Sequence, residues 1–177
     1  YDNGNRSLVS VLPNGDPTVG QLALVHRRPV SADFSVAYFN GTQSPNQGLY
    51  RRDIAAGETA RVNADERSGG DPLPAAAATF VGASADGEIA YFISNQQLVD
   101  EDEDTSNDLY RYDHSQAEGS RLTLISVDEE LDDGQAVVQA GHGVSADGGT
   151  VLFTASNQLV PGEPTGPGNK LYAYTDG

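Results

Sequence analysis

The chain has 177 residues, about one domain's worth, and its 26 acidic against 10 basic residues leave a formal net charge of −16. This balance argues against nucleic acid and anionic membrane surfaces as partners, because both are bound by clustered basic side chains. The chain has no cysteine, which excludes disulfides and cysteine-based metal centres, and no apolar run approaches the roughly 20 residues of a membrane span.

Apolar residues occur in short runs bounded by Gly, Asn, Asp and Pro. In chain order the clearest are Val36–Phe39, Ile89–Phe92 and Leu122–Ile125. No segment of useful length has the period of a helix, and the 20 glycines and 9 prolines indicate many turns. We therefore predict an all-β fold.

An internal repeat organises these strands. The tripeptide Ser-Ala-Asp begins at residues 31, 84 and 145, so its starts lie 53 and 61 residues apart. In each copy a phenylalanine follows eight residues after the serine, and a Leu-Tyr pair comes later. These residues are Phe39, Phe92 and Phe153, and Leu49-Tyr50, Leu109-Tyr110 and Leu171-Tyr172. Tandem repeats of this length predict stacked supersecondary units.

Each unit reads as a four-stranded antiparallel meander, which in tandem is most simply a β-propeller blade. The inner strand is expected directly before the tripeptide, and Asp86-Gly87 and Asp147-Gly148 suit a tight turn into the second strand. We expect the aspartate to accept hydrogen bonds from turn N–H groups. In the first copy Phe34 replaces the glycine, so we expect that turn to differ.

The repeats resemble a known family at the residues that follow each tripeptide. A Val/Ile-x-Phe strand leads to Ser94–Val99 or Ser156–Gly162, and Asp108–Asp113 reads Asp-Leu-Tyr-Arg-Tyr-Asp. This pattern is similar to the TolB-type, WD40-like (PD40) propeller repeats of bacterial surface and secreted proteins. The resemblance implies a propeller fold and an extracellular, cell-surface or periplasmic location, and it implies no single activity.

The unit boundaries predict one propeller segment over residues 1–177, with blade units at about 20–66, 75–128 and 136–177. Residues 1–12 are expected to be the outer strand of a blade, and the last unit holds three strands. Together the units amount to three blades, circularly permuted because the chain starts near the place in the repeat where it stops. Three blades are too few to close a ring in known propellers, which have about four to eight. We therefore expect a partner: a second copy in a six-bladed ring, a filament of copies, or the rest of a longer propeller. The absence of methionine fits a processed chain or a piece of a longer one.

An acidic run offers a candidate cation site. Residues 100–108 place carboxylates at alternate positions, a spacing suited to Ca²⁺, and the candidate ligands are Asp100, Asp102, Asp104 and Asp108. The run is not an EF-hand loop, because Thr105 and Arg111 stand where Gly and Glu are required. The alternative is a solvated acidic loop. No other cofactor is expected.

The inner strands offer a second candidate site. Counting back from the tripeptides places His26, Arg28 and His142 on strands that line a propeller channel, where they could converge on a small polar ligand. The alternative is that they are water-lined channel residues, or hydrogen-bonding groups between blades. Two histidines without a third matched ligand make a weak zinc site.

No catalytic arrangement is evident in the sequence. There is no Gly-x-Ser-x-Gly elbow, and no serine has a neighbouring motif that would position a base. We therefore expect a non-enzymatic binding or structural module that mediates protein–protein contact or self-assembly. The alternatives are a Ca²⁺- or small-ligand-binding propeller and the non-catalytic propeller part of a larger hydrolase.

Overall fold

The computed structural model describes residues 6–23, 27–69, 73–74, 76–127, 137–156, 158–162 and 168–177. Within them the fold is all-β, as predicted, with eleven strands in three antiparallel sheets. None of these residues belongs to a helix long and apolar enough to cross a membrane.

The first sheet holds β1 (Gly20–Leu22), β2 (Val36–Gly41), β3 (Gly48–Asp53) and β4 (Glu58–Arg61). The second holds β5 (Thr79–Ala83), β6 (Ile89–Ser94), β7 (Asp108–Asp113) and β8 (Leu122–Leu124). The third holds β9 (Val137–Val144), β10 (Thr150–Ser156) and β11 (Lys170–Thr175). We call these sheets blade 1, blade 2 and blade 3.

Each blade is an up-and-down meander in which strands adjacent in sequence pair with one another. The orders are β1-β2-β3-β4, β5-β6-β7-β8 and β9-β10-β11, so β11 is an edge strand where the other blades continue to a fourth. Residues 6–10, expected as an outer strand, form no strand here. Beyond them Val11 pairs with Pro17 in an isolated bridge.

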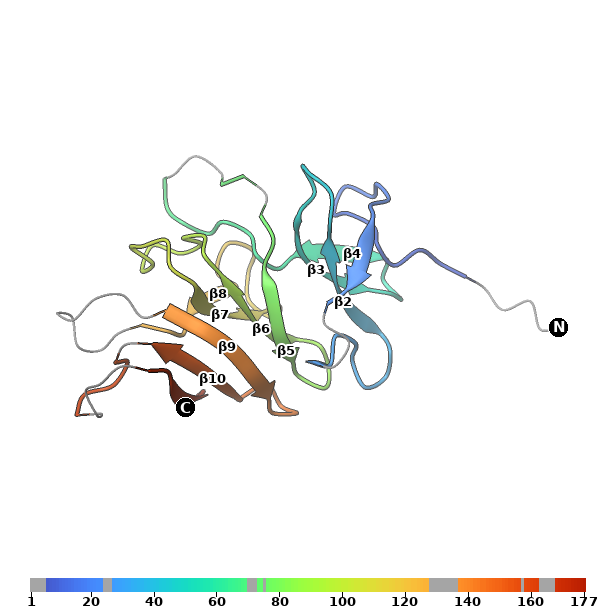
Figure 1. Cartoon of the computed structure of the whole chain (residues 1–177). Coiled ribbons are helices and arrows are strands. Elements are labelled where there is room, and N and C mark those ends of the chain that lie inside the picture. The colour runs from blue at the N-terminus through green and yellow to red at the C-terminus, as the bar shows by residue number, and fades with distance from the viewer. Residues whose placement is uncertain are drawn as a thin grey trace.

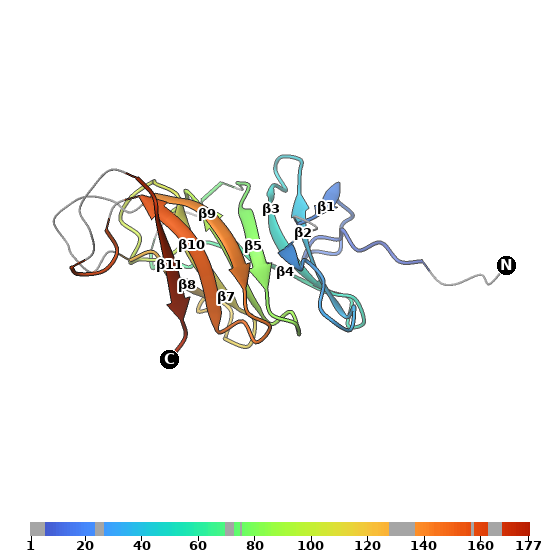
Figure 2. The same cartoon turned by 60° about the horizontal axis from the view of Figure 1, so that its bottom comes forward.

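The blades stand in a row rather than in a closed ring. Figure 2 shows blade 1, blade 2 and blade 3 in sequence order, and Figure 1 shows blade 1 and blade 3 on opposite sides of blade 2. The row therefore has two end faces, one on blade 1 and one on blade 3.

The hydrophobic core lies between the blades. Each blade stacks the repeat phenylalanine on the tyrosine of the Leu-Tyr pair, with ring centroids 5.3, 5.4 and 5.5 Å apart in blades 1, 2 and 3. In blade 2 this pair, Phe92 and Tyr110, belongs to a buried cluster with Tyr38 and Leu49 of blade 1. In blade 3 Phe153 packs in the same way with Tyr91 of blade 2. The alternating apolar residues of the sequence therefore fill two equivalent inter-blade layers.

One hydrogen bond recurs between successive blades. The Tyr38 hydroxyl donates to the carbonyl of Gly87, and the Tyr91 hydroxyl donates to the carbonyl of Gly148, each at 2.9 Å. The two tyrosines are fully buried. The bond satisfies a hydroxyl that would otherwise be buried without a partner, so it also orients the two blades.

The turn of blade 1 that contains Phe34 was expected to differ from the other two, and it does not. Phe34 has φ of 61°, close to the 74° of Gly87 and the 77° of Gly148 at the same repeat position. The Phe34 N–H donates to the Ser31 carbonyl, as the Gly87 N–H does to that of Ser84. The turn is therefore the same in all three blades, and its hydrogen bonds hold a phenylalanine in a conformation that usually requires glycine.

We predict that Gly148→Ala destabilises the protein more than Gly162→Ala. Both glycines have φ of 77°, but a Cβ at 148 would lie 2.6 Å from Ile89 Cβ, whereas nothing lies within 4 Å of one at 162. Backbone strain should cost each variant about 1 kcal/mol, and the clash between blades should add about 1–3 kcal/mol at 148. Urea unfolding measures the difference, and equal losses would contradict this close approach.

Candidate functional site

Three aspartates of the acidic loop come together. Asp102, Asp104 and Asp108 each place a carboxylate oxygen within 4.8 Å of the others'. Asp108 begins β7, and the other two lie in the loop between β6 and β7. This is the one group of three or more potential metal-ligating side chains found in the described part of the chain.

Hydrogen bonds from neighbouring residues hold all three carboxylates. The Ser106 N–H donates to Asp104 Oδ1. The Tyr110 hydroxyl donates to Asp102 Oδ2, and the Asp104 N–H donates to Asp102 Oδ1 at 3.1 Å. The Ser126 hydroxyl donates to Asp108 Oδ1 at 2.6 Å. Each bond fixes the direction in which the carboxylate presents its oxygens.

Asp108 keeps one oxygen without a partner. The residue is only 5% exposed, and its buried Oδ2 has no hydrogen-bond partner among the residues that the structure describes. Desolvation, with the nearby charges of Asp102 and Asp104, raises the pKa of Asp108 to about 7. A divalent cation would supply the missing partner and would offset the repulsion among the three carboxylates.

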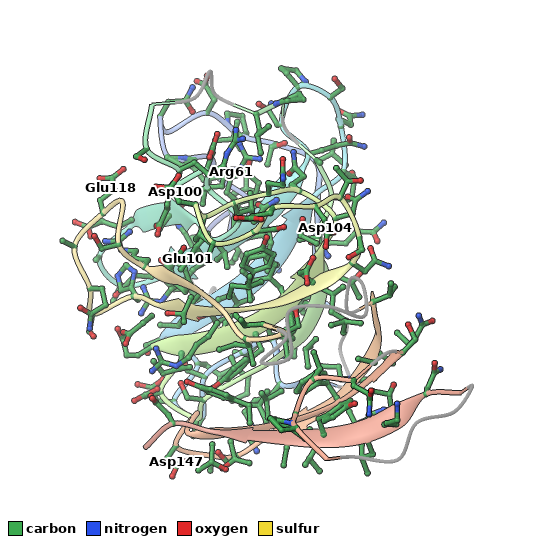
Figure 3. The ribbon with its side chains drawn as sticks, turned by 90° about the vertical axis from the view of Figure 1, so that its left-hand side faces the viewer. Arg61, Asp100, Glu101, Asp104, Glu118 and Asp147 are labelled. Atoms are coloured by element: carbon green, nitrogen blue, oxygen red, sulfur yellow. The ribbon has the colours of Figure 1, made fainter. Side chains whose placement is uncertain are left out.

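Asp100 lies outside this cluster. It accepts hydrogen bonds from the Ser68 N–H at 2.9 Å and from the Ser68 hydroxyl at 2.5 Å, and these bonds lower its pKa. Figure 3 shows Asp100 and Asp104 well separated, with Asp147 at the bottom of the view. Of the four ligands expected from the sequence, three are therefore adjacent and one is used to join two loops.

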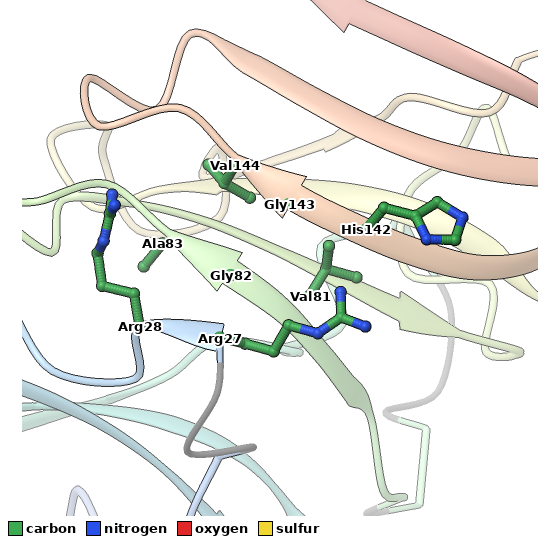
Figure 4. A pocket seen from close by; sticks show the side chains of 8 residues that line it. All are labelled: Arg27, Arg28, Val81, Gly82, Ala83, His142, Gly143 and Val144. Atoms are coloured by element: carbon green, nitrogen blue, oxygen red, sulfur yellow. The ribbon is translucent and has the colours of Figure 1, made fainter.

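The inner strands of blades 2 and 3 border a pocket, shown in Figure 4. Its lining comprises Arg27, Arg28, Val81, Gly82, Ala83, His142, Gly143 and Val144. Arg28 and His142 of the predicted channel set both line it, but they lie at opposite ends in Figure 4. His142 Nε2 lies 3.3 Å from Thr154 Oγ1 of its own blade. His26 lies outside the described residues.

Arg27, which the sequence did not single out, makes the polar contact across this pocket. Its guanidinium donates to the Gly141 carbonyl on β9. Gly141 permits the approach of the two inner strands, because a Cβ there would lie 2.2 Å from the Val81 side chain. Arg27 follows β1 and lies one position before Arg28. The spacing from the tripeptide alone could not show which of the two arginines bonds another blade. A residue that lines the pocket therefore makes a hydrogen bond from blade 1 to blade 3.

The repeated serines and aspartates are used by the turns, as predicted. In each turn the serine hydroxyl donates to the aspartate, at 2.7, 2.5 and 2.5 Å in blades 1 to 3. The same aspartate oxygen accepts from the N–H two residues on, at 3.0 Å each time. Backbone bonds of 2.7 Å from Ala32 N to the Ala85 carbonyl, and from Ala85 N to the Ala146 carbonyl, join the turns of neighbouring blades.

Comparison with known proteins finds similarity in structure alone. No protein-family model matches the chain, and no curated protein matches it. Among solved structures, a TolB from Agrobacterium tumefaciens is 18% identical with a TM-score of 0.47, covering 84% of this chain and 44% of its own. TolB from Acinetobacter baumannii is 20% identical with a TM-score of 0.47, covering 83% and 29%. The chain thus spans less than half the length of either structure.

We predict that the turns make the protein sensitive to acid. Hydrogen bonds from Ser35 and Ser31 lower the pKa of Asp33 to about 2, and equivalent bonds lower the pKa of Asp86 and Asp147. Since these pKa values lie below the unfolded value of 3.8, the stabilisation is complete above about pH 4 and is lost as the pH falls towards 2.

Asp86→Asn should lower the melting temperature at neutral pH by a few degrees and make its fall between about pH 4 and pH 2 shallower, because the charged acceptor is gone. Glu101→Gln, which removes a carboxylate from the exposed loop, is the control. Thermal unfolding followed by circular dichroism measures both. A pH profile of Asp86→Asn as steep as that of the wild type would contradict the role of this carboxylate.

Proposed function

We propose that the chain is a non-enzymatic β-propeller module of an extracytoplasmic protein, and that it mediates protein–protein contact through the ends of its row of blades. The observation that supports this proposal is the exposure of apolar side chains on the two end faces. Leu22 and Phe34 of blade 1 and Leu152 and Leu171 of blade 3 are exposed at the two ends, whereas Leu12 covers Phe39 and Tyr50 on blade 1. A row of blades with such ends gains stability when another blade covers them.

In the described part of the chain the repeated serines and aspartates are engaged in turns, which supports a binding role over hydrolysis. The repeated Ser and Asp side chains satisfy turn backbone groups. His114, which lies after β7, meets the Tyr112 hydroxyl at 2.9 Å and, in the described residues, is part of no serine–histidine pair. The extracytoplasmic location rests on the resemblance of the repeats to TolB-type proteins.

The oligomeric state of the purified chain tests the proposal in its self-assembling form. Sedimentation velocity at about 1–100 µM should show a species heavier than the 18.6 kDa monomer, with a fraction that rises with concentration. Addition of salt should strengthen the association, because each copy carries a net charge of −16. A compact monomer throughout this range would contradict self-assembly.

A second candidate function is Ca²⁺ binding by the acidic loop. The buried, unpartnered Asp108 Oδ2 beside Asp102 and Asp104 favours it over a merely solvated loop. The structure supplies these three carboxylates from one loop and one strand end, so solvent would complete the coordination of a hard cation.

Thermal unfolding with and without millimolar CaCl₂ tests this candidate at about pH 8, where Asp108 is ionised. The melting temperature of the wild type should rise by several degrees, because an ion bound only by the folded state stabilises it. The double variant Asp102→Asn/Asp104→Asn should lose the rise, whereas Asp100→Asn should keep it. An unchanged melting temperature in the wild type would remove the metal site.

A further inference from the structure

The pocket on the inner strands gathers basic side chains in an otherwise acidic protein. The chain carries 26 acidic residues against 10 Lys and Arg, yet the described lining of this pocket contains Arg27, Arg28 and His142 and no carboxylate. Charges more than about 10 Å away are largely screened at about 0.1 M salt, so the two guanidinium groups determine the local potential. The pocket therefore suits an anion although the whole chain is negative.

The same backbone irregularity presents the pocket residues in blades 2 and 3. The register of β5 against β6 shifts at Val81, and the register of β9 against β10 shifts at His142. Both residues stand three positions before their Ser-Ala-Asp tripeptide. A bulge of this kind turns the side chain of the extra residue in a new direction, and bulges recur beside binding sites.

Blade 1 has a larger break at the same point of its inner strand. The Ala23 N–H donates to the Tyr38 carbonyl at 3.1 Å, and the Tyr38 N–H donates to the Pro29 carbonyl at 2.7 Å, so the ladder is interrupted between Ala23 and Pro29. Arg28 ends this interruption, again three positions before its tripeptide. Its φ of 53° is a conformation that non-glycine residues keep only where the surrounding structure enforces it, typically at functional sites. All three blades thus present the residue at one repeat position to one pocket.

The basic groups lie at both ends of the pocket, with apolar groups between them. Figure 4 shows Arg28 at one end and His142 at the other, with the Arg27 guanidinium toward His142. The side chains of Ala83 and Val144 lie between the two ends. This arrangement matches a molecule that carries an anionic group at each end of a short apolar spacer.

Both arginines have donors to offer. Among the residues that the structure describes, neither Arg27 nor Arg28 forms an ion pair with a carboxylate. Arg27 Nη1 bonds the Gly141 carbonyl, which holds the guanidinium in place and uses only one of its five N–H groups. A guanidinium with unused donors binds a carboxylate through strong, directional hydrogen bonds.

From these observations we propose that the pocket binds a short aliphatic dicarboxylate, with one carboxylate on Arg28 and the other on Arg27 and His142. The pocket volume of about 220 Å³ lies below the roughly 300–1,000 Å³ of sites for drug-sized ligands, so it fits a chain of about four to six carbons. This binding site is separate from the protein–protein contact and from the acidic loop proposed above, because it lies within one chain and contains no carboxylate of that loop.

Titration with linear dicarboxylates from malonate to pimelate tests the site. The ¹H–¹⁵N spectrum of the labelled chain at about pH 7 should show the tightest binding at an intermediate length, because only that length reaches both ends. The amide signals of Gly82 and Gly143, which line the pocket, should move. Butyrate, which has a single carboxylate, should bind at least about tenfold more weakly than the best dicarboxylate.

Arg28→Gln should lower the affinity for the best dicarboxylate at least about tenfold, to that for butyrate, because one charged contact is lost. Arg27→Gln should weaken binding too, but it also removes the bond to Gly141, so Arg28→Gln is the sharper test. Arg6→Gln, at an exposed arginine outside the pocket, is the matched control and should keep the wild-type affinity. Circular dichroism melts establish that each variant is folded.

Three results would overturn the site. The first is that the Gly82 and Gly143 signals stay in place with every dicarboxylate up to about 20 mM. The second is that butyrate binds as tightly as the best dicarboxylate, a comparison that needs no variant. The third is an unchanged affinity in folded Arg28→Gln. None of these results depends on whether the chain self-assembles, so the site and the proposed function can fail separately.

Discussion

The close approach of each turn to the preceding blade determines how the blades stand in this protein. Gly148 packs against Ile89, and Gly87 against Val36, at distances that leave no space for a Cβ. The same glycines offer their carbonyls to Tyr91 and Tyr38. Since the contact is both steric and directional, it sets the distance and the orientation of successive sheets together, and the aromatic layers between the blades follow from it.

The Ser-Ala-Asp turn supports this contact from within each blade. Its serine and aspartate satisfy the N–H groups of a left-handed corner, so the corner presents the same carbonyl and the same flat surface each time. The strength of these bonds is visible at Phe34, which keeps the corner although its side chain disfavours it. The acidic loop takes no part in these turn hydrogen bonds, so its aspartates are free to serve another purpose, such as binding a cation.

The sequence predicted the repeat and the hydrogen bonding of its serine and aspartate in the turns, because serine, aspartate and glycine at fixed spacing have a specific local geometry. It predicted a cation site in the acidic run, but the choice among its carboxylates depended on which of them meet in space. Asp108 and Asp102 are buried beside Tyr110, whereas Asp100 bonds Ser68, 32 residues away. Likewise Arg27 and Arg28 are neighbours in sequence, and only the packing of β9 near the chain after β1 shows that Arg27 is the one that bonds the Gly141 carbonyl.

By itself, the sequence determined that the chain is an all-β repeat of three meanders, because strand period and turn chemistry are local properties. Only the tertiary structure decided which side of each repeat meets its neighbour, and therefore that the turn glycine of one blade lies against the second strand of the preceding blade. The physical reason is that this contact joins residues of different blades, such as Tyr38 and Gly87, whose relation depends on how the sheets pack rather than on their spacing along the chain.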